Sequence, residues 1–139
     1  MSGSTQANDE SAIRGVMSSY EEALNASNTA AVLPLYTEDG VFMPPYNQSA
    51  VGKTAVHKAY DAVFEAITLT VKFTIAELVL MSPEWAFVRT NSAGTNKINR
   101  TDSVSPEGNQ ELFIFNKGGD GKWRIARYSF SSTNPPPRA

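Results

Sequence analysis

The residues best suited to acid–base chemistry are an arginine and a glutamate on two predicted strands. Alternation along Phe87–Asn91 places the odd-numbered side chains on one face, so Arg89 and Asn91 point the same way. If Glu111 and Phe113 also face inward, Arg89 and Glu111 meet across neighbouring strands. A carboxyl group in an apolar cavity must be paired or protonated. We therefore expect Arg89 to hold Glu111 ionised or, without that pair, Glu111 to act as a protonated general acid.

The same two residues also have a purely structural interpretation. An Arg89–Glu111 ion pair could simply anchor the sheet. A strand register that differs by one residue would turn both side chains outward, because successive side chains of a strand point to opposite faces. Their predicted role as site residues therefore depends on which face is buried.

Tyrosines supply the other polar groups of the predicted site. Tyr20 and Tyr60 lie on the apolar stripes of two predicted helices, and a buried hydroxyl needs a partner, which can be the other tyrosine or a ligand. Tyr128 and Phe130 share strand parity and would line the same cavity. Ordinary core packing also accounts for all four positions. The remaining pocket residues that we predict are Asn91, Phe113 and Met43.

The composition argues against metal, cofactor and nucleotide chemistry. The chain has one histidine, His57, no cysteine, and carboxylates without the spacing of a metal site. His57 lies off the apolar stripe of its predicted helix, so we expect it to face solvent. No glycine-rich loop opens a helix after a strand, and Gly118–Gly121 is better interpreted as a hairpin turn. We predict no metal and no cofactor.

Charge and hydropathy exclude two classes of partner. The net charge is −2, the isoelectric point is near 5.4, and no cluster of Lys and Arg is present, so nucleic-acid binding is not expected. No apolar run approaches the ~18–20 residues that span a bilayer, and residues 1–10 lack a hydrophobic signal core. The 139 residues fit one domain. We expect a cytoplasmic protein with a small-molecule ligand and no membrane partner.

Three segments of the first half have apolar residues at the helical period, and the first of them follows Asp9, a suitable N-cap. Pro34 should kink the second helix, and Gly52 precedes the third. Glu38–Gly40 is predicted as a turn. The predicted helices span residues 9–25, 29–36 and 53–66.

From residue 69 the apolar period changes to two, and β-branched and aromatic residues become frequent. The predicted strands span residues 69–81, 85–98, 109–117 and 122–131, after a short strand at 41–43. Residues 100–108 are predicted as a polar loop. Three helices followed by four long antiparallel strands predict an α+β fold, in which a curved antiparallel sheet wraps around the helices and leaves a pocket between them. The predicted domain spans residues 9–131, with a flexible tail at 1–8 and a Pro-rich tail at 132–139.

The side-chain pattern of the last predicted strand indicates self-association. Trp123, Ile125 and Arg127 have the opposite parity to Tyr128. If Tyr128 faces the cavity, Trp123 and Ile125 form an outer apolar patch that is unusual for a monomer. A second subunit could cover this convex face, or Trp123 could pack at an edge of its own core.

Five stretches, in this order, carry a family resemblance: residues 20–25 (YEEALN), 35–45 (LYTEDGVFMPP), 52–56 (GKTAV), 111–115 (ELFIF) and 121–128 (GKWRIARY). Over roughly residues 9–131 the chain resembles the SnoaL-like and ketosteroid-isomerase-like branch of the nuclear transport factor 2-like superfamily. The Met-Pro-Pro and Trp-Arg-Ile-Ala-Arg-Tyr stretches resemble its SgcJ/EcaC-type subgroup, whose members largely lack an assigned function.

The resemblance implies a cone-shaped fold and a homodimer packed sheet against sheet. It places the pocket tyrosine of ketosteroid isomerases at Tyr20 and their second pocket acid at or next to Glu111. Their general base would fall at Pro44, and proline cannot accept a proton. Steroid isomerisation by that mechanism is therefore not expected.

Three functions agree with these observations. The first is a cofactor-independent isomerase, cyclase or lyase that acts on a small, partly apolar substrate and uses Glu111, Arg89 and Tyr20. The second is a binding protein for a hydrophobic small molecule, which the loss of the base at Pro44 favours. The third is a homodimerisation module with an incidental cavity. Fold alone does not decide among them.

Overall fold

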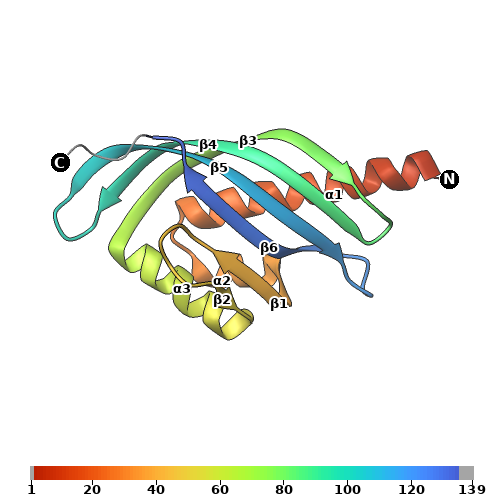
Figure 1. Ribbon diagram of the computed structural model, residues 1–139, viewed down its shortest axis with the longest axis horizontal. Helices are drawn as coiled ribbons and strands as arrows, with labels where there is room; N and C mark the ends of the chain where they lie inside the picture. Colours follow the sequence, from red (N-terminus) through yellow and green to blue (C-terminus); the bar gives the residue numbers. More distant parts are fainter. Residues whose placement is uncertain (1, 135–139) are drawn as a thin grey trace.

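The long strands β3 to β6 form a curved sheet that arches over two long helices, α1 and α3 (Figure 1). The shorter strands β1 and β2 lie beside α3. The computed structural model describes the backbone of residues 2–134 and the side chains of residues 5–134. The helices are α1 (Ser2–Asn25), α2 (Thr29–Val32), the 3₁₀ turn η1 (Leu33–Leu35) and α3 (Lys53–Ala66). The strands are β1 (Tyr36–Met43), β2 (Ala50–Val51), β3 (Ile67–Leu80), β4 (Trp85–Ile98), β5 (Ser103–Lys117) and β6 (Trp123–Ser132).

The strand order is β2-β1-β6-β5-β4-β3. Every pair of neighbours is antiparallel except β1 and β6, which run parallel. The α+β fold with a curved sheet around N-terminal helices is confirmed, although the sheet is mixed rather than wholly antiparallel. The two-residue strand β2 was not expected from the sequence.

The helices agree with the predictions except at the start of α1. Helix α3 has the predicted bounds, and Pro34 lies in the 3₁₀ turn that replaces the end of the predicted second helix. Helix α1 begins at Ser2, so the predicted start of the first helix at Asp9 is wrong. The domain bounds at 9–131 and the flexible tail at 1–8 remain predictions. Residue 1 and residues 135–139 of the predicted Pro-rich tail at 132–139 lie outside the described residues.

Asp9 is an interior residue of α1 that is bound to the sheet. Its Oδ1 accepts hydrogen bonds from Trp123 Nε1 at 2.9 Å and from Lys117 Nζ at 3.1 Å. The Trp123 bond, followed by Lys117, lowers the pKa of this carboxyl group against the opposing effect of burial. The carboxylate therefore joins the first helix to two C-terminal strands instead of capping the helix.

Two segments that were predicted as a turn and a loop belong to strands. Glu38–Gly40 lies within β1, where the register against β6 shifts between Tyr36 and Val41. Most of the predicted loop at 100–108 belongs to β5. Pro106 is tolerated there because the pairing of β6 with β5 ends at Asn109, so that this part of β5 has only β4 as a neighbour.

An irregularity between β5 and β6 reverses the side-chain parity of β6. Ile114 is opposite Arg127, but the next residue, Phe115, is opposite Ile125. Trp123 and Ile125 consequently lie on the inner face, 4% and 0% exposed. The predicted outer Trp/Ile patch is wrong, and the alternative, that Trp123 packs in its own core, is confirmed.

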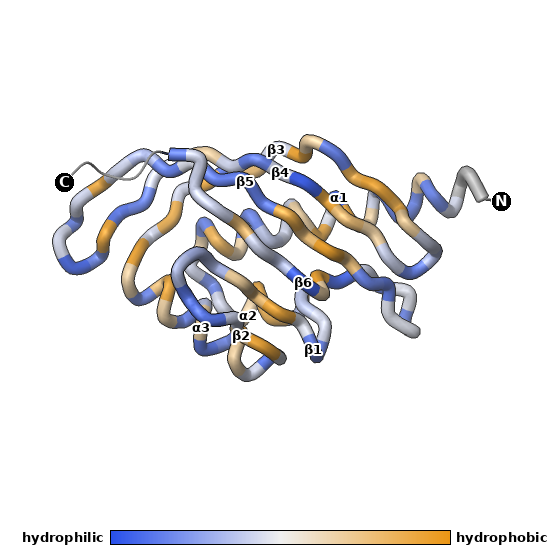
Figure 2. Tube along the Cα trace, viewed as in Figure 1, coloured by the Kyte–Doolittle hydropathy of each residue, from blue (hydrophilic) through white to orange (hydrophobic). Residues whose placement is uncertain are grey.

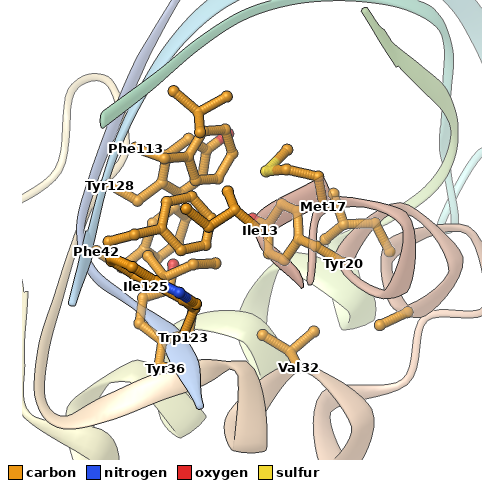
Figure 3. Close-up of a cluster of buried hydrophobic side chains, with 14 of the residues drawn as sticks. Ile13, Met17, Tyr20, Val32, Tyr36, Phe42, Phe113, Trp123, Ile125 and Tyr128 are labelled. Carbon is orange, nitrogen blue, oxygen red and sulfur yellow. The ribbon is translucent and has the colours of Figure 1, made fainter. Parts of the chain in front are cut away.

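The core lies between the concave face of the sheet and the helices. Hydrophobic and hydrophilic residues alternate along the helices and strands (Figure 2), as expected for elements that are buried on one side. Figure 3 shows Ile13, Met17 and Tyr20 of α1 facing Phe113 and Tyr128 of the sheet. Among the described residues, no helix is long and apolar enough to cross a membrane.

Candidate functional site

A pocket of about 250 Å³ opens between the concave face of the sheet and helices α1 and α3. Most of its wall is aromatic or aliphatic. The nonpolar and tyrosine lining comprises Tyr20, Leu24, Phe42, Pro44, Pro45, Tyr60, Val63, Ile67, Leu69, Val71, Phe73, Tyr128 and Phe130. The remaining lining residues are Asn47, Ser92, Asn96, Glu107, Asn109 and Glu111. All of the latter except Asn47 come from β4 and β5, so most of the amide and carboxyl groups lie on one wall of a largely apolar pocket.

Glu111 is the buried carboxyl group of this wall, with 4% of its surface exposed. Thr90, directly opposite on β4, donates its hydroxyl to Oε1 at 2.6 Å, and Ser92 donates to Oε2 at 2.5 Å. The side chain is therefore held in place from both oxygens. Both oxygens accept hydrogen bonds from the protein, so the proton of the neutral carboxyl group can be donated to a ligand.

Burial dominates the ionisation of Glu111. Removal from water raises the pKa of this carboxyl group, while the hydrogen bonds from Ser92 and Thr90 lower it and the neighbouring carboxylate of Glu107 raises it. The net direction is upward, so the neutral acid is populated at higher pH than in an ordinary glutamate. A group of this kind can donate a proton, or a hydrogen bond, to a ligand oxygen.

Three tyrosine hydroxyls form a chain beside the pocket. The hydroxyl oxygens of Tyr20 and Tyr60 lie 2.6 Å apart, and those of Tyr36 and Tyr60 lie 2.7 Å apart. Burial raises the pKa of all three phenols, which keeps them protonated. Three hydroxyls that share two hydrogen bonds retain one proton, for which the Tyr128 hydroxyl beside Tyr20 is one acceptor and an outside oxygen is another. Because Tyr20 and Tyr60 line the pocket, a ligand oxygen can be that acceptor.

Stacked rings hold the pocket tyrosines in position. Phe113 and Tyr128 stack with ring centroids 4.0 Å apart, and Tyr128 in turn stacks on Phe42 and Phe130. Phe113 is fully buried and supports Tyr128 from behind, so it does not line the cavity as predicted. Phe42, the neighbour of the predicted Met43, stacks on Tyr60 and lines the pocket.

The predicted contact between Arg89 and Glu111 is wrong. Arg89 is opposite Leu112 on the outer face of the sheet, and its Nε donates to Glu77 Oε1 at 3.0 Å. Its side chain is 52% exposed. The inner residues of β4 are the even-numbered ones, including Thr90 and Ser92, so the assumed parity was off by one residue.

For the same reason the prediction of Asn91 as a pocket residue is wrong, because its side chain is on the outer face of β4 and exposed. Met43 is half-buried but does not contribute to the pocket wall. The structure places the remaining predicted residues at the pocket. These are Tyr20, Tyr60, Glu111, Tyr128 and Phe130.

Most residues of the polar wall were not predicted from the sequence. Thr90 and Ser92 would have followed from the opposite parity of β4. Asn96 and Glu107 lie at the distal end of β4 and β5, and Glu107 fell within the segment predicted as a loop. The only signal for it was the alternation of Glu107, Asn109 and Glu111, which continues the inner face of β5.

His57 faces solvent as predicted. Its side chain is 53% exposed, and Nε2 lies 3.2 Å from Asp61 Oδ2, one helical turn away. Within residues 2–134, no group of three or more His, Cys, Asp or Glu side chains is arranged to hold a metal ion.

The cone-shaped sheet, the helices on its concave side and the pocket between them define a domain of the nuclear transport factor 2-like fold. The sequence matches the SnoaL-like domain family over residues 17–128, and the chain belongs to that family. The search of curated proteins gives no significant match.

Solved structures agree with this assignment. A ketosteroid isomerase-like protein from Erwinia carotovora atroseptica is 38% identical, with 90% of this chain and 96% of that chain covered and a TM-score of 0.87. A proposed scytalone dehydratase from Novosphingobium aromaticivorans is 19% identical (95% and 89% covered, TM-score 0.81). A hexachlorocyclohexane dehydrochlorinase, LinA type 2, is 9% identical (97% and 92% covered, TM-score 0.83). The last two share the fold; none of these matches tests the narrower SgcJ/EcaC-type resemblance.

Proposed function

We propose that this protein is a cofactor-independent enzyme of the isomerase, cyclase or lyase type that acts on a small, partly apolar substrate. Glu111 is its general acid, and Tyr20 is a second donor to the same substrate oxygen. The pocket volume of about 250 Å³ lies just below the ~300–1,000 Å³ of typical ligand sites. The substrate is accordingly a compact molecule.

The observation that carries this proposal is the setting of Glu111. It is a buried carboxyl group of raised pKa that lines an aromatic pocket and is fixed by two hydroxyl donors. Structural carboxylates are normally paired with a cation when buried. Glu111 has hydroxyl partners instead, which favours proton donation over anchoring.

The chemistry follows from these donors. For a ketone, the Glu111 proton moves to the carbonyl oxygen, a proton leaves the adjacent carbon to solvent water, and the C–H electrons form the C=C bond of an enol. The hydroxyl chain at Tyr20 stabilises the developing negative charge on the oxygen. Isomerisation, cyclisation and elimination next to a carbonyl can all begin from such an intermediate.

The test is proton exchange on a probe ketone. Incubation of the protein with β-tetralone in D₂O should accelerate deuterium incorporation next to the carbonyl, measured by ¹H NMR. Glu111→Gln keeps a hydrogen-bond donor but has no transferable proton. We therefore expect it to bind the ketone and to lose exchange by about 100-fold or more.

Glu84→Gln is the matched control, because Glu84 is exposed in the β3–β4 turn. It should exchange the probe like the unmodified protein. Saturable binding of the ketone without any exchange above the buffer rate would contradict catalysis.

A binding function without chemistry is the second candidate, and Pro44 favours it. This residue stands where the resemblance places a general base, and it lines the pocket. A binding protein would hold the ketone without exchange, so the same experiment separates the two functions.

We also propose a homodimer through the convex sheet face. Phe87 and Ile114 are opposite one another on this outer face, and both are only half-buried. Nearby Leu112 and Trp85 are 45% and 43% exposed. Such a contiguous apolar patch is a common feature of subunit interfaces, and Arg89 and Glu77 would lie among its polar groups.

Sedimentation velocity at micromolar concentration tests the dimer. We expect a dimer for the unmodified chain and a monomer for Leu112→Lys. Val104→Lys is the control, because Val104 is 60% exposed near the distal end of β5. A monomer before any substitution would contradict this interface.

A further inference from the structure

A second polar cluster lies on the pocket wall beyond Glu111, formed by Asn96, Glu107 and Asn109. Ser92 is opposite Asn109 in the β4–β5 ladder, and Gly94 is opposite Glu107. The cluster therefore continues the same inner face toward the distal end of the two strands. None of its side chains is assigned a contact with the substrate in the function proposed above, although Glu107 raises the pKa of Glu111.

The hydrogen bonds of this cluster all run toward Glu107. Asn96 Nδ2 donates to Glu107 Oε2 at 2.7 Å, and Asn109 Nδ2 donates to Oε1 at 2.8 Å. The carboxylate thereby fixes both amides with their nitrogens toward it. A flipped amide would place a carbonyl oxygen against the carboxylate, so the orientation follows from charge.

The carbonyl oxygens of the two amides are free to accept hydrogen bonds. Both Oδ1 atoms are buried, and neither has a hydrogen-bond partner among the described residues. Asn109 as a whole is only 8% exposed. A buried acceptor without a donor is unfavourable, and both residues line the pocket. A ligand in the pocket is thus the available source of donors.

The charge of the lining indicates which donors fit. Two carboxyl groups, Glu107 and Glu111, line the pocket, and its described lining contains no Lys, Arg or His. An anionic ligand would meet acceptors and negative charge at this end. An ammonium group offers three donors and a positive charge to one carboxylate and two carbonyls. The aromatic rings of Phe42, Phe73 and Phe130 on the remaining wall also attract a cation.

We propose that the Asn96–Glu107–Asn109 cluster is a subsite for the protonated amino group of a small ligand whose apolar body lies against the aromatic wall. This inference deepens the proposed function, on which it rests, by assigning the substrate class of the same pocket. The ligand is an amine with a compact hydrophobic body, bound through its ammonium group at Glu107.

Calorimetric titration at neutral pH with three probes of matched body tests the subsite. The probes are 2-phenylethylamine, 2-phenylethanol and 3-phenylpropanoate, which are cationic, neutral and anionic. We expect the amine to bind about tenfold or more tighter than the alcohol, and the propanoate to bind most weakly. Glu107→Gln should reduce amine affinity about tenfold and change alcohol affinity less than about twofold. Glu84→Gln should leave both unchanged.

A second measurement uses the unmodified protein, so its result does not depend on whether a variant folds. Titration of the ¹⁵N-labelled protein with the amine should shift the side-chain amide signals of Asn96 and Asn109, and the alcohol should shift them less. Equal affinity for amine and alcohol, unmoved amide signals, or a folded Glu107→Gln that keeps full amine affinity would each overturn the subsite. Ketone exchange that depends on Glu111 alongside any of these results would leave the proposed function standing. Amine selectivity without exchange would support the subsite and remove only the catalytic role.

Discussion

At the scale of single residues, the fold keeps a carboxyl group in a place that disfavours its charge. Glu111 is buried, and its hydroxyl donors offset the loss of water only in part. The folded state therefore prefers the neutral acid more than the unfolded chain does. Groups that are poised in this way are frequent at functional sites. Their cost to stability is the reason that replacing them often strengthens a fold.

This leads to a prediction on stability. Because the pKa of Glu111 is raised in the folded state, stability is fully present below the ordinary glutamate pKa of 4.5 and is lost as pH rises through the higher folded value. Glu111→Gln removes this dependence. The variant should have a higher Tm than the unmodified protein at pH 7, and the difference should shrink toward pH 4. Thermal unfolding followed by circular dichroism at several pH values measures it; a lower Tm at pH 7 would contradict the burial argument.

At the scale of elements, the long strands β3, β4 and β5 set the shape of the pocket, and one glycine allows them to approach. A Cβ atom at Gly94 would lie 1.8 Å from the backbone oxygen of Thr70 on β3. Gly94 is opposite Val71 on one side and Glu107 on the other. The sheet can therefore close over the pocket here only without a side chain.

Gly94→Ala should consequently destabilise the domain by about 1–3 kcal/mol, the usual cost of forcing extra volume into a packed site. Gly119→Ala is the matched control, since nothing lies within 4 Å of a Cβ at that position; it should change stability by less than about 0.5 kcal/mol. Urea unfolding of the two variants compares them. Equal stability would mean that β3 and β4 adjust freely around Gly94.

The elements also explain what the sequence could and could not predict. The bounds of α3 and the sequence order of the helices and long strands followed from apolar periodicity and the Gly52 signal. Strand parity did not, because hydrophobicity does not mark the inner face of β4. That strand carries Phe87 outward and Thr90 and Ser92 inward, since its inner face is partly a pocket wall. The irregularity before Phe115 then reversed the parity of β6, and no local pattern announces such a shift.

At the scale of the whole molecule, a buried carboxylate joins elements that are far apart in the chain. Asp9 in α1 accepts hydrogen bonds from Trp123 and Lys117, more than 100 residues later. Its side chain is 12% exposed. The contact closes one end of the helix–sheet core, and its charge makes it stronger than a neutral hydrogen bond.

Asp9→Asn should therefore destabilise the protein by about 1–3 kcal/mol at pH 7. The pKa of Asp9 is lowered in the folded state, so its contribution is present above the unfolded value of 3.8 and is lost as pH falls below it. The loss should thus diminish below pH 3.8, because protonation of this carboxyl group in the unfolded chain then favours unfolding of the unmodified protein. Chemical denaturation at pH 7 and pH 3 measures it. Asp61→Asn, at an exposed position of α3, provides the control, and an Asp9→Asn deficit that is constant with pH would contradict this role.

The strand order has a consequence for how the domain is synthesised. β6 lies between β1 and β5, so the last strand of the domain is an interior member of the sheet. Until about residue 132 has left the ribosome, β1 and β5 each present an open edge. The hydrogen bond between Trp123 and Asp9 of α1 cannot form before Trp123 is synthesised. At roughly 5–20 residues per second, the edge of β1 stays open for about 4–18 seconds and that of β5 for about 1–3 seconds. From the synthesis of β1 onward the nascent chain therefore carries an exposed strand edge, and chaperones that shield such edges should associate with it until β6 is inserted.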